Sequence, residues 1–192
     1  MKHSNKLGGK ITGKGREDIP NLAFRGMTVF MRLIDFFSNY SSNNIKTLNL
    51  KPGQTVIDYG CGPARYIQDA SIIVGNSGKV IATDIHPLAI KKVKEKIKKH
   101  NLLNVEAVLA TGYDTRIPSE TADVVYALDM FHMIEEPKKL LAELCRLVKN
   151  EGRIIIEDGH QPRSETIRKI ENSGILKIIK ETRVHVKCKK NL

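Results

Sequence analysis

The stretch VIDYGCGPA at residues 56–64 joins an apolar strand to the start of a helix. Gly60 and Gly62 carry no side chains, so the backbone can pass close to a ligand there, and the helix N-terminus beyond them favours electron-rich groups. Asp58, just before the turn, can direct a carboxylate at a cationic group. Because ligands of alternating α/β sheets bind at the carboxyl ends of the strands, this stretch predicts a ligand site.

Strand-like and helix-like segments alternate from this stretch onward. Helices between the first five strands imply right-handed crossovers and a parallel sheet covered on both faces. The last two strand candidates are too close in sequence for a parallel crossover and must form an antiparallel hairpin. The prediction is an α/β protein with a Rossmann-like doubly wound sheet: five parallel strands plus a C-terminal antiparallel β-hairpin, seven strands in all, with helices on both faces. The expected strands are 55–59, 79–83, 104–109, 123–128, 153–157, 175–180 and 183–189, and the expected helices are 64–74, 87–99, 137–149 and 164–172.

Three regions are expected along the chain. Residues 1–18 hold four glycines and five basic residues and little to bury, which predicts a flexible basic arm. Residues 19–50 read as helical, with an interruption at 38–44. Residues 51–192 form the main domain. The stripe of aromatic residues and methionines in the second region can pack on the main domain or act as an N-terminal helical lid, and the stripe consists of Phe24, Met27, Phe30, Met31, Ile34 and Phe37.

The composition favours a globular protein of the reducing cytoplasm. Of the 192 residues, 41% are hydrophobic and 28% are charged, and no apolar run approaches the roughly 18 residues of a membrane span. The start of the chain is polar and basic, unlike a secretory signal. The cysteines are odd in number and far apart, which excludes a disulfide framework or a Cys-x-x-Cys zinc site. We therefore expect a cytoplasmic protein without membrane contact.

The net charge of +11 raises nucleic acid as a possible partner. Many of the lysines fall within 87–99, where an apolar stripe at helical spacing makes them a solvated helix face. Aromatic residues are only 5% and there is no Trp, so stacking platforms for single-stranded bases are scarce. A small-molecule substrate is favoured, and nucleic acid stays open as the alternative.

A second acid, Asp84, closes the second strand. An acid at this place can accept both hydroxyl groups of a ribose, which suits any nucleoside-bearing cofactor. A dinucleotide fold is the competing interpretation, but it needs a small residue three positions after Gly62, where this chain has Arg65.

These features together resemble the class I S-adenosylmethionine-dependent methyltransferases, in particular their small-molecule, type 11-like branch. The resemblance covers nearly all of 54–189 and rests on the glycine turn, the acid that ends the second strand, the strand count and the terminal hairpin. It implies S-adenosylmethionine as cofactor, with Asp58 near its methionine ammonium. The cofactor-binding residues it implies are Asp58, Gly60, Cys61, Gly62, Asp84, Ile85, Thr111, Gly112, Ala127 and Leu128.

Two positions depart from the family pattern. Ala64 replaces the usual third glycine, which would tighten or shift the cofactor if its φ is positive. Thr111, at the position expected to contact the adenine, lacks the family's carboxylate, and Asp114 lies three residues later.

Candidates for catalysis are weaker. Asp129 and His160 are the best polar candidates near the transferred methyl group, with a base required only for a hydroxyl or protonated amine acceptor. The spacing of His86, His132 and His160 is not that of a metal motif, so the sequence predicts no metal site.

The expected function is transfer of a methyl group to a small-molecule acceptor by in-line displacement. The alternatives are methylation of RNA or protein through the basic surfaces, and a non-catalytic cofactor-binding module. The resemblance places substrate-covering elements either after the fifth strand or ahead of the first strand. Only residues 158–163 separate the fifth strand from the next helix, so by elimination 24–37 is expected to cover the methyl-donor pocket, with Arg25, Met27 and Met31 nearest to it. The alternative is that this helix packs on the sheet away from the pocket.

Overall fold

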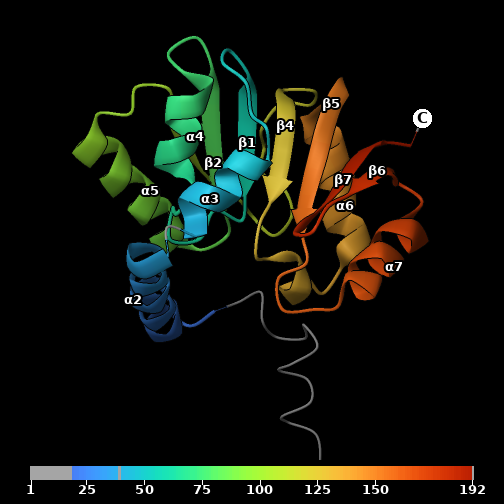
Figure 1. Cartoon of the computed structure of the whole chain (residues 1–192), viewed down its shortest axis with the longest axis horizontal. Coiled ribbons are helices and arrows are strands. Elements are labelled where there is room, and N and C mark those ends of the chain that lie inside the picture. Colours follow the sequence, from blue (N-terminus) through green and yellow to red (C-terminus); the bar gives the residue numbers. More distant parts are fainter. Residues whose placement is uncertain (1–18, 39, 192) are drawn as a thin grey trace, which may run out of the picture.

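The computed structural model describes residues 19–38 and 40–191. The basic arm predicted for residues 1–18 lies outside these ranges. The described chain forms one central sheet with helices on both faces (Figure 1).

The sheet has seven strands in the order β3-β2-β1-β4-β5-β7-β6. Strands β1 to β5 pair in parallel, and β7 pairs antiparallel with both β5 and β6. This confirms the predicted doubly wound sheet with its terminal hairpin. The strands are β1 (Thr55–Tyr59), β2 (Lys79–Asp84), β3 (Val105–Leu109), β4 (Ala122–Ala127), β5 (Val148–Glu157), β6 (Leu176–Glu181) and β7 (His185–Lys190).

The order of the strands reverses between β1 and β4, which lie side by side at the centre of the sheet. Val56, Ile57 and Asp58 of β1 pair with Val124, Val125 and Tyr126 of β4. In a doubly wound sheet the crevice outside the carboxyl ends of such a strand pair is the ligand site. The glycine turn that follows β1 lies at this end.

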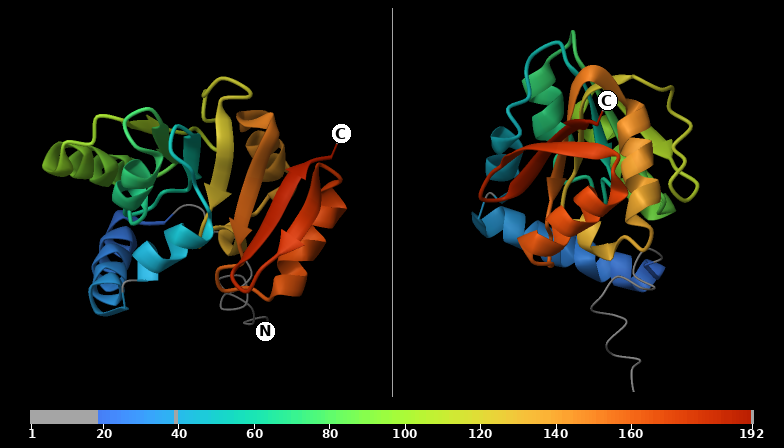
Figure 2. Two further views of the ribbon diagram at one scale, coloured as in Figure 1. Left: turned by 45° about the horizontal axis from the view of Figure 1, so that its top comes forward. Right: turned by 90° about the vertical axis from the view of Figure 1, so that its right-hand side faces the viewer.

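Helices cover both faces of the sheet (Figures 1 and 2). On one face of the sheet, a buried hydrophobic cluster includes residues of the four helices α2, α3, α4 and α5. On the other face, a second cluster includes residues of α6 and α7. The helices are α2 (Asn21–Ser38), α3 (Tyr40–Thr47), α4 (Ile67–Val74), α5 (Pro87–His100), the 3₁₀ helix η1 (Phe131–Met133), α6 (Pro137–Leu147) and α7 (Arg163–Ser173).

Local sequence signals explain where α5 begins and which face of α6 is buried. α5 has proline in its first turn, and the Nδ1 atom of His86 accepts the N–H of Leu88 at 3.1 Å as the N-cap. In α6 the residues Leu140, Leu141, Leu144 and Leu147 form one fully buried face.

No helix within the described ranges is long and apolar enough to cross a membrane.

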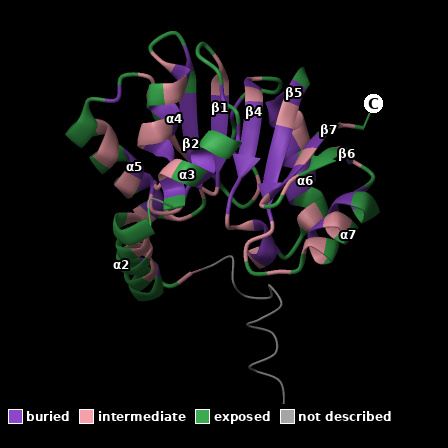
Figure 3. Cartoon of the chain, viewed as in Figure 1, coloured by how far each residue is buried: buried purple, intermediate pink, exposed green. Residues whose placement is uncertain are grey.

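The N-terminal helices differ from the expectation in two respects. α3 begins at Tyr40, so most of the predicted interruption at 38–44 is helical, and Ile45 and Leu48 beyond it are fully buried in the same cluster as β1. In α2 only Phe24 is buried; Phe30 and Phe37, expected to share its stripe, are 63% and 80% exposed. Figure 3 shows that α2 stays largely exposed.

Candidate active site

A cleft opens at the carboxyl ends of β1, β2 and β4, beneath α2. Its lining is mostly apolar and includes the glycine turn after β1 and the acid at the end of β2. Of the predicted site residues, the cleft is lined by Gly60, Cys61, Gly62, Asp84, Ile85, Gly112, Leu128 and Asp129. A mostly apolar cleft with few polar groups is typical of small-molecule sites.

The glycine turn is fastened to the end of β2. The N–H groups of Gly60 and Cys61 donate to the carbonyl oxygen of Thr83 at 2.8 and 3.0 Å. The carboxylate of Asp84 accepts the N–H of Gly62 at 2.8 Å through one oxygen and the N–H of His86 at 2.8 Å through the other. Asp84 therefore fixes the turn while it lines the cleft.

Gly60 and Gly62 both have the left-handed backbone conformation, with φ of 74° and 48°. A side chain on Gly60 would meet Met130 at 3.0 Å, whereas the space beside Gly62 is open. The backbone is thus bare where the cleft passes the turn, which fits a cofactor that lies against it.

Asp58 lies behind the cleft wall. Its side chain is 1% exposed, and its Oδ2 atom has no hydrogen-bond partner among the described residues. Burial, with a contribution from the charge of Asp84, raises the pKa of Asp58 to about 8. The carboxyl group is therefore largely protonated at neutral pH in this state.

Ala64, which stands in place of the usual third glycine, has a positive φ of 63°. Such a conformation costs a residue with a Cβ about 1–2 kcal/mol. Ala64 is fully buried, does not line the cleft, and its carbonyl oxygen accepts a hydrogen bond of 2.7 Å from the Nζ of Lys96. The replacement of glycine therefore strains the backbone of the turn but leaves the cleft open.

Three of the predicted cofactor contacts do not line the cleft. Asp58 and Ala127 are buried behind it, and Thr111 is exposed outside it. Thr111 instead forms a bridge with Asp114, which is also exposed. Its neighbours Ala110, Gly112 and Tyr113 line the cleft at the position where Thr111 was expected.

The inner face of α2 forms one wall of the cleft. Phe24, Met27 and Met31 line it, and the ring of Phe24 stacks on His86 with 4.3 Å between ring centroids. Arg25, expected beside these methionines, is exposed and does not line the cleft. Phe24, Met27 and Met31 are spaced three and four residues apart and therefore share one face of the helix, whereas Arg25, one residue after Phe24, lies on another face.

An ion pair connects α2 to the glycine turn. The guanidinium of Arg65 donates to Asp35 through Nε at 2.8 Å and through Nη2 at 2.6 Å. The Arg65 side chain is 9% exposed and lines the cleft. Hydrogen bonds from Arg65 and its positive charge lower the pKa of Asp35 against the opposing effect of burial. A bidentate pair of this kind fixes orientation as well as distance.

A second polar contact holds α3 against the end of β5. The hydroxyl of Tyr40 donates to Glu157 at 2.9 Å, and the amide of Asn44 donates to the same oxygen at 3.3 Å. Burial raises the pKa of Glu157, against the effect of these two donors. Together with the Arg65 pair, this contact ties both N-terminal helices to the strand ends.

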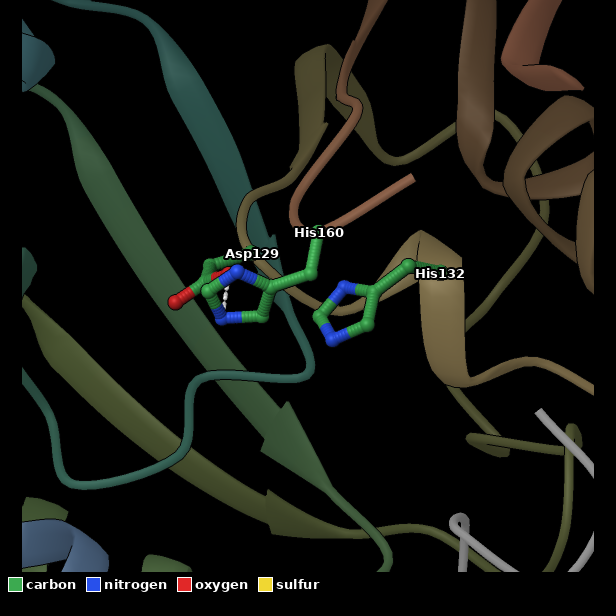
Figure 4. Close-up of side chains that lie close together, drawn as sticks. All are labelled: Asp129, His132 and His160. Carbon is green, nitrogen blue, oxygen red and sulfur yellow. Dashed lines mark ion pairs between the residues drawn. The ribbon is translucent and has the colours of Figure 1, made fainter. Parts of the chain in front are cut away.

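The two candidates for catalysis, Asp129 and His160, lie together at the end of β4 and β5 (Figure 4). The His160 Nε2 atom is 4.0 Å from the Asp129 Oδ1 atom. Asp129 lines the cleft with φ of 53°, and burial raises its pKa against the effect of the charges of His160 and Arg65. The ring of His132, which is buried, lies edge-on to His160 with 4.9 Å between centroids.

Cys61 is a packed thiol. It is 4% exposed, and burial raises its pKa well above the usual value. A thiol that stays protonated is a poor nucleophile.

Sequence reasoning missed several residues of the cleft. Met130 and Met133 follow β4 and line the cleft, as does Tyr59 at the end of β1. The sequence signal that could have identified Met130 and Met133 is their position as large apolar residues shortly after a central strand. Nothing in the local sequence pairs Asp35 with Arg65, because the two are thirty residues apart.

Known proteins to which this chain is similar include methyltransferases. The profile of the methyltransferase domain family matches residues 50–187. Ubiquinone/menaquinone biosynthesis C-methyltransferase UbiE of Salmonella arizonae is 30% identical over 121 residues, which make up 62% of this chain and 48% of that protein. The chain spans about half the length of the curated relatives it matches.

Solved structures share the fold. A SAM-dependent methyltransferase from Aquifex aeolicus superposes with a TM-score of 0.65 at 27% identity, covering 78% of this chain and 88% of that one. A TehB-like SAM-dependent methyltransferase from Corynebacterium glutamicum superposes with a TM-score of 0.69 at 16% identity, covering 89% and 100%.

Proposed function

The chain belongs to the methyltransferase domain family, and we propose that it transfers a methyl group from S-adenosylmethionine to a small-molecule acceptor. The observation that carries the proposal is the cleft at the β1–β4 reversal point, where bare glycine backbone and the Asp84 carboxylate face apolar residues of α2. This combination suits a ligand with a ribose at one end and a reacting centre that must be kept from water.

The polar side of the cleft would hold the methyl donor. Asp84 keeps lone pairs for ribose hydroxyls in addition to the two backbone N–H groups that it accepts. The open space beside Gly62 leaves room for the donor against the turn. Asp58, behind the turn, is protonated before the donor binds and would ionise when the donor's ammonium group binds, so that its negative charge faces that group.

The apolar side of the cleft would align the acceptor. S-adenosylmethionine supplies a methyl group on a positively charged sulfur, which an acceptor atom attacks in line. The reaction needs proximity, alignment and exclusion of water more than it needs a catalytic triad. Phe24, Met27 and Met31 provide an apolar cover, and Asp129 provides a polar group in the lining, with His160 beside it but outside the lining. A covered cleft of this kind favours a small acceptor over a polymer.

The proposal is tested in two stages. Calorimetry with S-adenosylmethionine and its demethylated product establishes donor binding, which a non-catalytic module would share. Transfer of a labelled methyl group to pools of small molecules, RNA and protein then identifies the acceptor class. We expect label in the small-molecule pool alone. Label only in RNA or only in protein would make that polymer the acceptor instead. The absence of label from all three pools would contradict the proposal that the protein is an enzyme.

The role of α2 as a cover leads to a prediction about Asp35. Asp35→Asn removes the charge that holds Arg65, so α2 should detach more readily from the glycine turn. Removing one partner of a half-buried charged pair costs about 1–3 kcal/mol, so we expect the dissociation rate of the demethylated donor to rise about 5- to 100-fold, as measured by stopped-flow competition.

Glu95→Gln is the matched control, because it breaks the exposed Lys92–Glu95 pair on α5, at 2.7 Å, outside the cleft. The control should leave the dissociation rate unchanged. Equal rates in wild type and Asp35→Asn would show that α2 does not control exchange of the donor.

A further inference from the structure

Three side chains with metal-binding groups meet at the edge of the cleft, although no local sequence motif joins them. Of the three, Asp129 lines the cleft, and His132 and His160 lie next to it outside the lining. Asp129 follows β4, His132 lies in η1 and His160 follows β5. One ligand atom from each lies within 4.8 Å of the other two (Figure 4). Neighbouring parallel strands bring their carboxyl ends to the same edge of the sheet, which explains how residues of two loops converge.

The backbone at two points makes this convergence possible. Asp129 has φ of 53°, a left-handed conformation that is uncommon for residues with a side chain and is often found at functional sites. Gly159, with φ of 63°, is the residue before His160, and a Cβ atom placed on it would overlap the Nδ1 atom of His132. Only glycine at this position lets the loop after β5 pass against the His132 ring.

We propose that Asp129, His132 and His160 bind a divalent transition-metal cation of the zinc class, whose remaining coordination positions accept oxygen atoms of the methyl acceptor. Two imidazoles and a carboxylate are ligands that such cations prefer, and three protein ligands are the number that leaves positions open for a substrate.

The geometry is close to what a cation needs. Bonds of about 2.0–2.2 Å to nitrogen and oxygen place neighbouring ligand atoms about 3–3.5 Å apart, so the three groups must draw together by roughly 1 Å. The His160 side chain is 77% exposed and can rotate to make this adjustment, while the buried His132 stays in place.

The charge of Asp129 is also suited to a cation. Its carboxylate accepts no hydrogen bond from the residues that the structure describes, and the positive groups that act on it are His160 and Arg65. Arg65 is already engaged by both oxygens of Asp35. Among the described residues, the Asp129 carboxylate is therefore paired at 4.0 Å with the His160 ring, which is charged only when it is protonated.

This inference rests on the proposed function and makes the acceptor more specific: a molecule with a hydroxyl group next to a second oxygen, so that both can reach one cation. The cation lowers the pKa of the hydroxyl, whose proton passes to water. The oxygen then forms its bond to the methyl carbon as the carbon–sulfur bond breaks, and the sulfur keeps the electron pair as a neutral thioether.

The test uses the full chain without methyl donor. We expect wild-type protein to bind one equivalent of Zn²⁺ by calorimetry, to give visible absorption bands with Co²⁺, and to bind Mg²⁺ much more weakly. His160→Ala removes an exposed side chain, and Asp129→Asn keeps a residue that tolerates positive φ, so both variants should fold. Each should lower the Zn²⁺ affinity at least about tenfold and abolish the Co²⁺ bands.

His100→Ala is the control, because His100 is an exposed histidine at the end of α5, away from the cleft. It should bind both cations like wild type. Absence of stoichiometric Zn²⁺ or Co²⁺ binding, or equal affinity in the two site variants and wild type, would overturn the metal site. Calorimetry with the demethylated donor on the same samples keeps the two questions apart: donor binding without metal binding overturns only this inference, and metal binding without donor binding overturns the proposed function.

Discussion

Replacing Asp84 with asparagine is expected to weaken binding of S-adenosylmethionine by about 5- to 150-fold, equivalent to about 1–3 kcal/mol. The carboxylate accepts the N–H groups of Gly62 and His86, one on each oxygen. An amide offers only one acceptor, so one N–H would face an NH₂ group, and ribose hydroxyls would lose a charged partner. Calorimetry gives the dissociation constant, and thermal unfolding verifies that the variant is folded.

Asp114→Asn is the control for this experiment. Asp114 also follows a strand on the same side of the sheet, but it is exposed, does not line the cleft, and accepts only the N–H of Arg116 at 2.9 Å. Its substitution should leave the dissociation constant unchanged. An unchanged constant in folded Asp84→Asn would refute the ribose assignment.

The second large effect concerns stability and pH at Asp58. The folded-state pKa is about 8, whereas an unfolded aspartate titrates near 3.9. Between about pH 4 and pH 8 the folded protein therefore holds one proton more than the unfolded chain, so this residue makes the free energy of unfolding fall as pH rises, by about 1.4 kcal/mol per pH unit. Asp58→Asn removes this dependence. The variant should gain stability relative to wild type between pH 5 and pH 8 in denaturant titrations.

The same substitution should impair binding of the methyl donor. If Asp58 faces the ammonium group of the donor, binding will drive the carboxyl group to ionise, and affinity of the wild type will rise between pH 6 and pH 8 with release of up to one proton. Calorimetry in buffers of different ionisation enthalpy measures that proton. A variant that is more stable yet binds the donor with wild-type affinity and the same proton release would exclude Asp58 from the donor site.

The sheet could be predicted from sequence because its signals are local. β1 has the predicted bounds, and each of the other six strands overlaps its predicted segment. The helix after the glycine turn begins at Ile67 rather than 64, because Ala64 has a left-handed φ that no helix can include. α6 ends at Leu147 because the chain enters β5 at Val148. These differences arise from backbone geometry at single residues, which periodicity does not report.

The candidate site was predictable only in part. Gly60, Gly62 and Asp84 occupy fixed places relative to the first two strands, so their convergence follows from topology. The pairing of Asp35 with Arg65 and the meeting of Asp129 with two histidines depend on how separate loops and helices pack. Thr111 does not line the cleft in this structure, where it lies in a turn closed by a Thr111–Asp114 bridge that strand periodicity does not predict.

Arg65 combines two properties that are usually separate in a nucleotide-binding fold. It stands where a dinucleotide fold needs a small residue for helix and strand to close over a pyrophosphate, and it is also the residue that α2 grips through Asp35. Under the proposed function, one side chain would thus both disfavour a dinucleotide and hold the helix that covers the methyl donor. Replacing Arg65 with the small residue that a dinucleotide fold needs would therefore also remove the ion pair that connects α2 to the glycine turn.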